Sequence, residues 1–249
     1  MRSSAKRKNP EKWIIEGIAL FNLKKYNEAI EYFDRILKVD PKHVDALFNK
    51  GRALHNLHKF NDALTYYNSV IRLSPRHLKA WRWKGFALRS LDRFEEASRC
   101  FDKEIELEPD GDYTWYIWHN KGQMVHIMEQ FENAIQCYDN AIKLFPDHAD
   151  TWYCKGLASY GINKYDDVIE CCEKALDIEP DYFYAWYGKG LALHSLNNYE
   201  EAIECYEKVI ESDPMHIDAW FNKALANRSL EHLKQSKIQE YHAINESKY

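Results

Sequence analysis

The chain has 249 residues, of which 45% are hydrophobic and 29% are charged, and its net charge is −5. This balance is typical of a soluble globular protein and argues against both a disordered acidic chain and a basic nucleic-acid-binding domain. There is no run of about 18 apolar residues, and the basic start of the chain has no apolar stretch behind it. We therefore expect neither a transmembrane helix nor a secretory signal, and we expect the protein to be cytoplasmic.

Glycine and proline recur at a fixed interval. Six glycines follow one another at steps of 34, 34, 37, 34 and 34 residues, and they are Gly17, Gly51, Gly85, Gly122, Gly156 and Gly190. Six prolines recur at the same intervals, and they are Pro41, Pro75, Pro109, Pro146, Pro180 and Pro214. A period of 34 residues indicates an internal repeat, and single motifs have to be interpreted within it.

Each repeat predicts two amphipathic helices. In the second repeat, DALFNKGRALHNL and FNDALTYYNSVIRL both carry apolar residues at spacings near 3.6. Only about four residues join them, so they are expected to form an antiparallel hairpin. The glycine leaves room for the second helix, an alanine twelve residues later supplies a matching small side chain, and aromatic residues fill the space on either side. The proline ends the second helix because it has no N–H to donate.

In chain order, the sequence divides into an arm, an array of repeats and a cap. A basic, flexible arm is expected at 1–9, followed by a repeat array at 10–232. The repeats are expected near 10–43, 44–77, 78–111, 115–148, 149–182 and 183–216, with a partial seventh at 217–232. The segment 233–249 has lost the alanine and aromatic positions, so we expect it to be a separate capping helix whose outer side faces water.

The fourth repeat begins with three additional residues, in the segment PDGDYTWYIW. Pro109, Asp110 and Gly111 favour a turn. Either the loop is longer here or the first helix of this repeat gains nearly a turn.

This pattern of spaced Trp, Gly, aromatic, Ala and Pro positions resembles the tetratricopeptide repeat over nearly the whole chain. The resemblance implies an all-α fold, a right-handed superhelical solenoid of antiparallel helix hairpins. It also implies a non-catalytic scaffold or adaptor that binds a peptide segment of another protein in a concave groove. In that family the first helix of each repeat lines the groove.

The exposed positions of the first helices supply the candidate ligand-binding residues. They are Asn49, Arg52, Lys79, Arg82, Phe86, Arg89, Tyr116, His119, Gln123, His126, Tyr153, Tyr160, Tyr184 and Tyr187. The cations fall in the second and third repeats and the tyrosines in the fourth to sixth. Such a groove would suit a peptide with an acidic end and apolar side chains further along.

Two other binding modes remain open. One is self-assembly, in which a terminal repeat or the groove holds another copy of the chain. The other is the carboxylate clamp by which chaperone adaptors of this family hold a chaperone tail. The clamp positions here carry Ile14, Ile18, Asn49, Lys79 and Trp83, of which only Asn49 and Lys79 match. Nucleic-acid binding through the arm at 1–9 is disfavoured by the acidic net charge.

Catalytic, cofactor and metal sites are not expected. Gly188, Lys189 and Gly190 look like a phosphate loop, but no strand precedes them and Lys189 belongs to a lysine position that recurs in six repeats. Cysteines of one helix position would be about 8–10 Å apart in stacked helices, too far for a disulfide. Four histidines stand in the linkers two residues after a proline, and they are His43, His77, His148 and His216.

Overall fold

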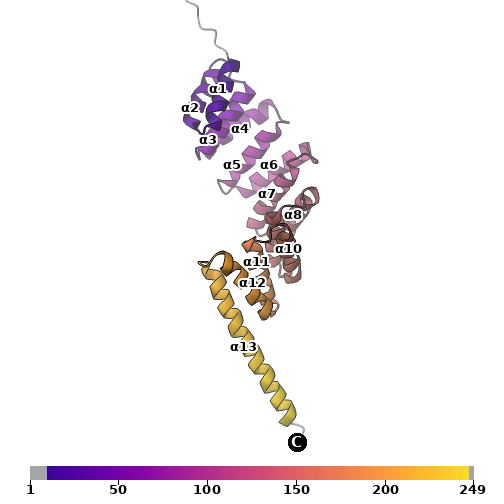
Figure 1. Cartoon of the computed structure of the whole chain (residues 1–249). Coiled ribbons are helices and arrows are strands. Elements are labelled where there is room, and N and C mark those ends of the chain that lie inside the picture. Colours follow the sequence, from indigo (N-terminus) through magenta and orange to yellow (C-terminus); the bar gives the residue numbers. More distant parts are fainter. Residues whose placement is uncertain (1–9, 247–249) are drawn as a thin grey trace, which may run out of the picture. The chain divides into compact units, whose positions relative to one another are not determined.

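The computed structural model describes residues 10–246, with side chains described up to residue 240 (Figure 1). Within these residues the chain forms thirteen helices and no strand. They are α1 (Pro10–Asn22), α2 (Tyr26–Leu37), α3 (Val44–Asn56), α4 (Phe60–Leu73), α5 (Leu78–Arg89), α6 (Phe94–Leu107), α7 (Thr114–Ile127), α8 (Phe131–Leu144), α9 (Ala149–Gly161), α10 (Tyr165–Ile178), α11 (Phe183–Ser195), α12 (Tyr199–Ser212) and α13 (Ile217–Glu246). The all-α fold expected from the repeats is confirmed, and the arm at 1–9 lies outside the described residues.

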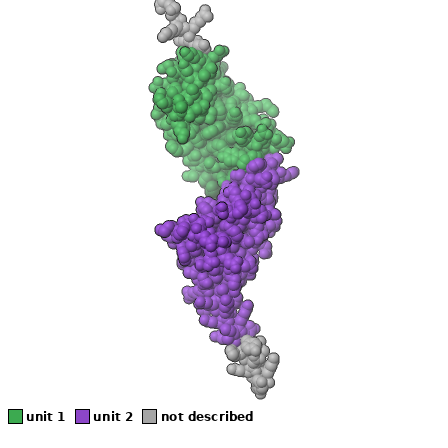
Figure 2. Space-filling model, viewed as in Figure 1, with its two compact units in different colours: residues 1–128 green, residues 129–249 purple. Residues whose placement is uncertain are grey.

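The helices belong to two compact units, residues 1–128 and 129–249 (Figure 2). In unit 1 the hairpins α1–α2, α3–α4 and α5–α6 stack in chain order, and α7 packs on α6. In unit 2, α8 packs on the hairpin α9–α10, which is followed by α11–α12 and then by α13. Within each unit, each helix packs against its neighbours in sequence, as expected for a repeat array.

The turn inside each hairpin uses a left-handed residue seven positions after the glycine column. These residues are Lys24, His58, Asp92, Glu129, Asn163 and Asn197, with φ between 55° and 63°. A residue in this conformation ends the first helix and reverses the chain. The aromatic residue two positions later then begins the second helix.

The glycine column has the packing role predicted for it. A Cβ atom on Gly85 would lie 2.5 Å from Cε1 of Phe101, and one on Gly190 would lie 2.7 Å from Cε1 of Tyr206. Gly156 is different, because Cys172 stands where the other repeats carry a ring. The nearest atom to a Cβ there is Cβ of Cys171, at 3.3 Å.

Three linker histidines begin the helices that follow them, a role that their spacing alone did not predict. Nδ1 of His43, His77 and His216 accepts a hydrogen bond from the backbone N–H three residues later, at 3.3, 3.1 and 3.1 Å. Each histidine thereby caps the first turn of the helix that follows it, and the N–H groups of Ala80 and Ala219 also donate to the carbonyl oxygen of the same histidine.

The additional three residues of the fourth repeat lengthen both the loop and the helix. Six residues, 108–113, separate α6 from α7, whereas four separate α4 from α5. The helix α7 begins eight residues before Gly122, whereas α5 begins seven residues before Gly85. Two of the three residues therefore enter the loop and one enters the helix.

The C-terminal segment differs from the prediction. We expected a first helix at 217–232 and a separate capping helix at 233–249, but α13 is continuous from Ile217 to Glu246. The position that reverses the chain in the other repeats holds Glu231, which is helical here. The aromatic position that follows holds Leu233, which is 37% exposed. Because this segment lacks both the left-handed turn residue and the aromatic residue that begins a second helix, the helix continues without a turn. Residues 231–240 are all exposed.

None of the described helices combines the length and the apolar character needed to cross a bilayer.

Candidate functional site

In unit 1, Arg52 lies among aromatic rings contributed by three first helices. Its guanidinium carbon is 4.3 Å from the ring centroid of Phe21 on α1, 5.8 Å from that of Phe48 on α3 and 5.4 Å from that of Trp83 on α5. At these distances the ring faces attract the cation. The arrangement holds Arg52 in a fixed position and removes part of its hydration.

No carboxylate partners Arg52 among the described residues. Its Nη1 donates to Oδ1 of Asn49 at 3.2 Å, and its Nε is buried with no hydrogen-bond acceptor. Burial lowers the pKa of Arg52, although a guanidinium stays charged at any physiological pH. A partly desolvated cation without a carboxylate partner is a favourable position for an incoming anion.

Arg89 on α5 is the second cation of this face. Its Nη1 donates to Oδ1 of Asn120 at 2.8 Å, and its guanidinium carbon is 5.4 Å from the ring centroid of Phe86. The hydrogen-bond acceptor of Arg89 is thus a neutral amide. The ring of Phe86 also contacts that of Tyr116, which is 37% exposed, with centroids 6.1 Å apart.

His55 lies near both arginines and is neutral at pH 7. Its ring contacts that of Trp83, with centroids 5.0 Å apart, and its Nδ1 is buried without a hydrogen-bond partner. Burial lowers the pKa of His55 to about 4, with smaller contributions from the charges of His58 and Arg89. The cationic character of this face at pH 7 therefore comes from the arginines.

The other two predicted cations have different environments. Arg82 is paired with Glu104 inside the hairpin α5–α6, with Nε 2.8 Å from Oε1, and the Glu104 side chain is only 4% exposed. Burial raises the pKa of Glu104 and the bond from Arg82 opposes that shift. The charge of Arg82 is therefore neutralised within the fold by Glu104. Lys79 is exposed and forms no ion pair with the part of the chain that is described.

The α7 candidates are mostly covered. His119 is 4% exposed, and its Nε2 lies 3.0 Å from Nε2 of the half-buried Gln123. His126 is half-buried, and burial lowers its pKa. Of the four α7 residues proposed from the sequence, only Tyr116 is an exposed side chain.

In unit 2, three tyrosines from α9 and the start of α11 form a cluster. The ring centroids of Tyr153, Tyr182 and Tyr184 are 5.7 to 5.9 Å apart. The hydroxyl of Tyr182 donates to Oδ1 of Asp150 at 2.7 Å, and Tyr184 is 48% exposed. Burial raises the pKa of both Tyr153 and Tyr182.

The remaining candidates continue along the same helices. The hydroxyl of Tyr187 accepts a hydrogen bond from Nδ2 of Asn222 at 2.9 Å. The hydroxyl of Tyr160 lies 3.5 Å from Oγ of Ser195. Unit 2 therefore presents aromatic surface with polar tips, whereas unit 1 presents two cations between rings.

Sequence reasoning missed two residues that complete these clusters. Trp83 stands at a position of the carboxylate clamp, where the sequence analysis counted it only as a residue that does not match the clamp. A tryptophan at a position where the clamp has a polar residue could have indicated an aromatic cluster. Tyr182 occupies the linker position that holds a histidine in four other repeats, and this difference could have identified it.

Family comparisons agree with the repeat pattern. Models described as tetratricopeptide repeat match residues 10–43, 149–182 and 183–216, and related models match 32–65, 56–112 and 122–163. Together these matches span 10–112 and 122–216, which is well over half of the chain. Among curated protein sequences, none matches the chain.

Several solved structures are similar in fold to this chain. YrrB, described as a TPR protein with an unusual peptide-binding site, is 19% identical with a TM-score of 0.67, covering 77% of this chain and 97% of its own. MamA from Desulfovibrio magneticus RS-1 is 22% identical with a TM-score of 0.65, covering 70% and 96%. Cut9–Hcn1, an APC/C hetero-tetramer, is 18% identical with a TM-score of 0.61, covering 89% and 44%. With the repeat pattern, the hairpin packing and the family matches in agreement, this chain belongs to the tetratricopeptide repeat family.

Proposed function

We propose that this protein is a non-catalytic adaptor that binds a segment of another protein along the exposed face of its first helices. Acidic residues of that segment bind to Arg52 and Arg89 in unit 1. Other side chains of the segment lie on the tyrosines of unit 2. A scaffold role agrees with the family, whose members build extended binding surfaces from stacked hairpins.

The observation that carries the proposal is the environment of Arg52. The side chain lies against three rings, and its Nη1 donates to the neutral amide of Asn49 and to no carboxylate of the described residues. A carboxylate on this face would receive a charge-assisted hydrogen bond and would restore the solvation that burial removed. Arg82 shows the contrast, because its charge is already neutralised by Glu104.

The tyrosine cluster supports the second half of the proposal. Tyrosine buries a large area with few rotatable bonds, and it is enriched where protein surfaces bind one another. Tyr184 and Tyr116 remain the most exposed of the candidate rings. One solved structure of similar fold, YrrB, is described as having a peptide-binding site, and this is consistent with peptide binding by this chain.

A selection experiment tests the acidic preference before the partner protein is identified. A library of short random peptides displayed on phage is selected on the wild-type protein, on Arg52→Gln/Arg89→Gln, and on Arg72→Gln. Arg72 is an exposed arginine on the second helix α4 and serves as a matched control. Far-UV circular dichroism confirms that the variants keep the wild-type helix content.

We expect peptides selected on the wild type and on Arg72→Gln to be enriched in Asp and Glu. The double variant should lose this enrichment while still selecting aromatic and aliphatic residues. For an individual selected peptide, the double variant should weaken binding at least tenfold, or about 1.4 kcal/mol. Equal acidic enrichment on all three proteins would refute the proposal.

Self-association remains a second candidate, supported by exposed apolar residues at the start of the array. Ile15 on α1 and Leu23, which directly follows α1, are each 68% exposed. Light scattering over a range of protein concentrations distinguishes the two. A constant monomer mass argues against self-association, and a mass that rises with concentration supports it.

A further inference from the structure

The helix α13 leaves large apolar side chains on its surface. Four of them lie within residues 217–225 and have exposed fractions between 40% and 80%, and they are Ile217, Trp220, Phe221 and Leu225. On the opposite side of the helix, Ala226 is fully buried in a cluster with Cys205 and Tyr206 of α12. One face of α13 therefore packs on unit 2, and an apolar face stays uncovered.

This face is uncovered because α13 is the last described helix, and no second helix of its own repeat lies on it. In the preceding repeat, a Cβ atom on Gly190 would meet the ring of Tyr206 on the second helix. The same position of the seventh repeat holds Ala224, which is exposed. An apolar face of this kind on a folded protein marks a surface that binds another protein segment.

One row of exposed residues runs along this face at spacings of three, four and three residues, and it consists of Asp218, Phe221, Leu225 and Arg228. Alternating spacings of three and four keep side chains on the seam along which two helices pack lengthwise. At 1.5 Å per residue the row is about 15 Å long. It ends there because the next residues of the same row, His232 and Gln235, are polar.

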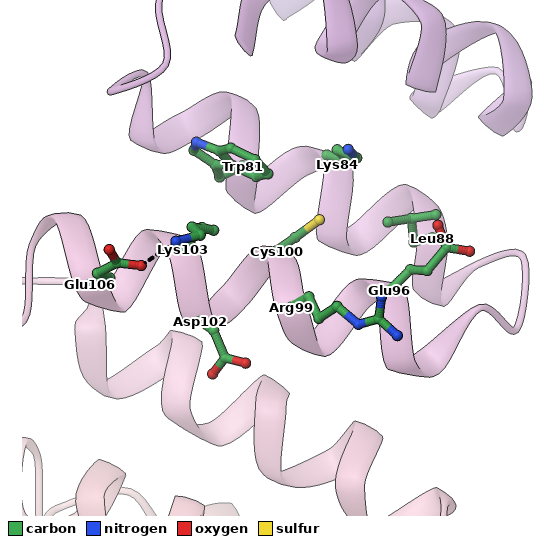
Figure 3. Close-up of a pocket in the computed structure, with 9 residues that line it drawn as sticks. All are labelled: Trp81, Lys84, Leu88, Glu96, Arg99, Cys100, Asp102, Lys103 and Glu106. Carbon is green, nitrogen blue, oxygen red and sulfur yellow. Dashed lines mark hydrogen bonds and ion pairs between the residues drawn. The ribbon is translucent and has the colours of Figure 1, made fainter. Parts of the chain in front are cut away.

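The charges at the two ends of the row have no partner within the described chain. Many other charged side chains on the surface are paired, as in the hollow beside Lys84, where Glu106 is paired with Lys103 at 2.5 Å (Figure 3). Asp218 and Arg228 differ, because neither forms an ion pair with any described residue. The row therefore has an acid at its N-terminal end, a base at its C-terminal end and two apolar residues between them.

Such a row is complementary to itself when a second copy of α13 runs antiparallel to the first. With the two helices centred midway between Phe221 and Leu225, Phe221 of one copy lies opposite Leu225 of the other. In the same register, Asp218 of each copy lies opposite Arg228 of the other. Twofold symmetry makes every contact twice. A parallel pair would instead place like charges opposite each other, which is unfavourable.

We propose that two copies of this chain bind each other through α13, antiparallel, along the row from Asp218 to Arg228. The second copy is the occupant because the row matches its own reverse in both charge and apolar character. The row is short, so the association is reversible. This inference specifies the surface of the self-association considered above. It does not involve Arg52 or Arg89, so the failure of either proposal is distinguishable from that of the other.

The test is analytical ultracentrifugation of the full chain and of charge-reversed variants. Asp218→Arg and Arg228→Asp are each measured alone, mixed with one another, and combined in one chain. Two charge reversals outside the row serve as matched controls. They are Glu204→Arg on α12 and Lys237→Asp on α13, both at exposed residues without a described ion pair. Far-UV circular dichroism confirms that each variant keeps the wild-type helix content.

We expect a reversible monomer–dimer equilibrium for the wild type and for both controls. Each single reversal should raise the dissociation constant at least tenfold, or about 1.4 kcal/mol. The mixture of the two single variants and the doubly reversed chain should both dimerise as the wild type does, because opposite charges face each other again. Recovery in the doubly reversed chain is specific to the antiparallel arrangement.

The proposal is overturned if the wild type stays monomeric up to about 1 mM. It is also overturned if the single reversals dimerise as well as the wild type, if the controls are weakened equally, or if the doubly reversed chain stays as weak as the single variants.

Discussion

In unit 1 the exposed face of the first helices carries guanidinium groups that lie against aromatic rings, whereas in unit 2 the first helices and the linker before α11 carry tyrosines, two of whose hydroxyls bond to polar side chains of the same unit. Arg52 has a ring on three sides and no carboxylate. The hydroxyls of Tyr187 and Tyr182 are each hydrogen-bonded to a polar side chain. The repeat fixes where a side chain stands, and its identity decides whether that position is already satisfied or still able to bind a ligand.

The largest expected effect is a difference in stability between substitutions at two arginines of unit 1, Arg82 and Arg52. Arg82→Met should lower the free energy of unfolding by about 3 kcal/mol, because it leaves Glu104 buried without its partner. Arg52→Met should change it by less than about 1 kcal/mol, because no buried charge loses a partner and a long apolar chain still fills the space. Urea denaturation measures both. Equal losses would show that Arg52 is as much a part of the fold as Arg82.

The next effect compares how the hairpins of the two units are packed. Gly85→Ala should cost about 1–3 kcal/mol, because its Cβ would overlap the ring of Phe101, which is fully buried. Gly156→Ala should cost clearly less, because the nearest atom, Cβ of Cys171, is 3.3 Å away and has to move only slightly, and because alanine is about 1 kcal/mol better than glycine in a helix. Thermal denaturation of the two variants checks this. A larger loss at Gly156 would contradict the packing described.

A smaller effect concerns pH. His55 has a folded-state pKa of about 4, below the value near 6.5 in the unfolded chain. The unfolded state therefore binds a proton first, and stability should fall as pH is lowered from about 6.5 towards 4. With allowance for the partial exposure of the ring, we expect a loss of about 1 kcal/mol between pH 7 and pH 5. His55→Gln should reduce this loss, as measured by urea denaturation at both pH values. An unchanged pH dependence would mean that other groups cause it.

The smallest effect tests the tyrosines of unit 2. Tyr182→Phe removes one hydrogen bond, to Asp150, and should cost about 0.5–1.5 kcal/mol of stability. Tyr184→Phe should cost less, because its side chain is 48% exposed and water can solvate its hydroxyl in both the folded and the unfolded state. Urea denaturation of the two variants provides the comparison. If both changes cost the same, the Tyr182 hydroxyl does not organise the cluster.

Much of this structure could be predicted from the sequence, because the repeat is enforced by contacts that recur. Glycine opposite a ring, a left-handed turn residue and a proline at the end define each hairpin. The candidate positions on the first helices followed from the same register. The two clusters described above include Arg52, Arg89, Tyr153 and Tyr184.

Two features could not be predicted from the repeat pattern, because they depend on residues that differ from one repeat to the next. Arg82 is drawn inward because Glu104 stands at a position that is apolar in the other repeats, with Ile36 and Val70 as examples. An acid in a core position is a usable signal, and the sequence-based prediction did not use it. The continuous helix α13 also follows from a missing feature, since no residue near Glu231 reverses the chain.

The central claim is that Arg52 in unit 1 binds a carboxylate of the ligand while the tyrosines of unit 2 do not. A double-mutant cycle tests it directly, with a selected peptide whose acidic residue is changed to its amide and with Arg52→Gln, each alone and together, measured by calorimetry. We predict that the two changes are coupled by at least about 1 kcal/mol, and that the same peptide change is additive with Tyr184→Phe. Additive effects at Arg52, or coupling at Tyr184 instead, would contradict the claim.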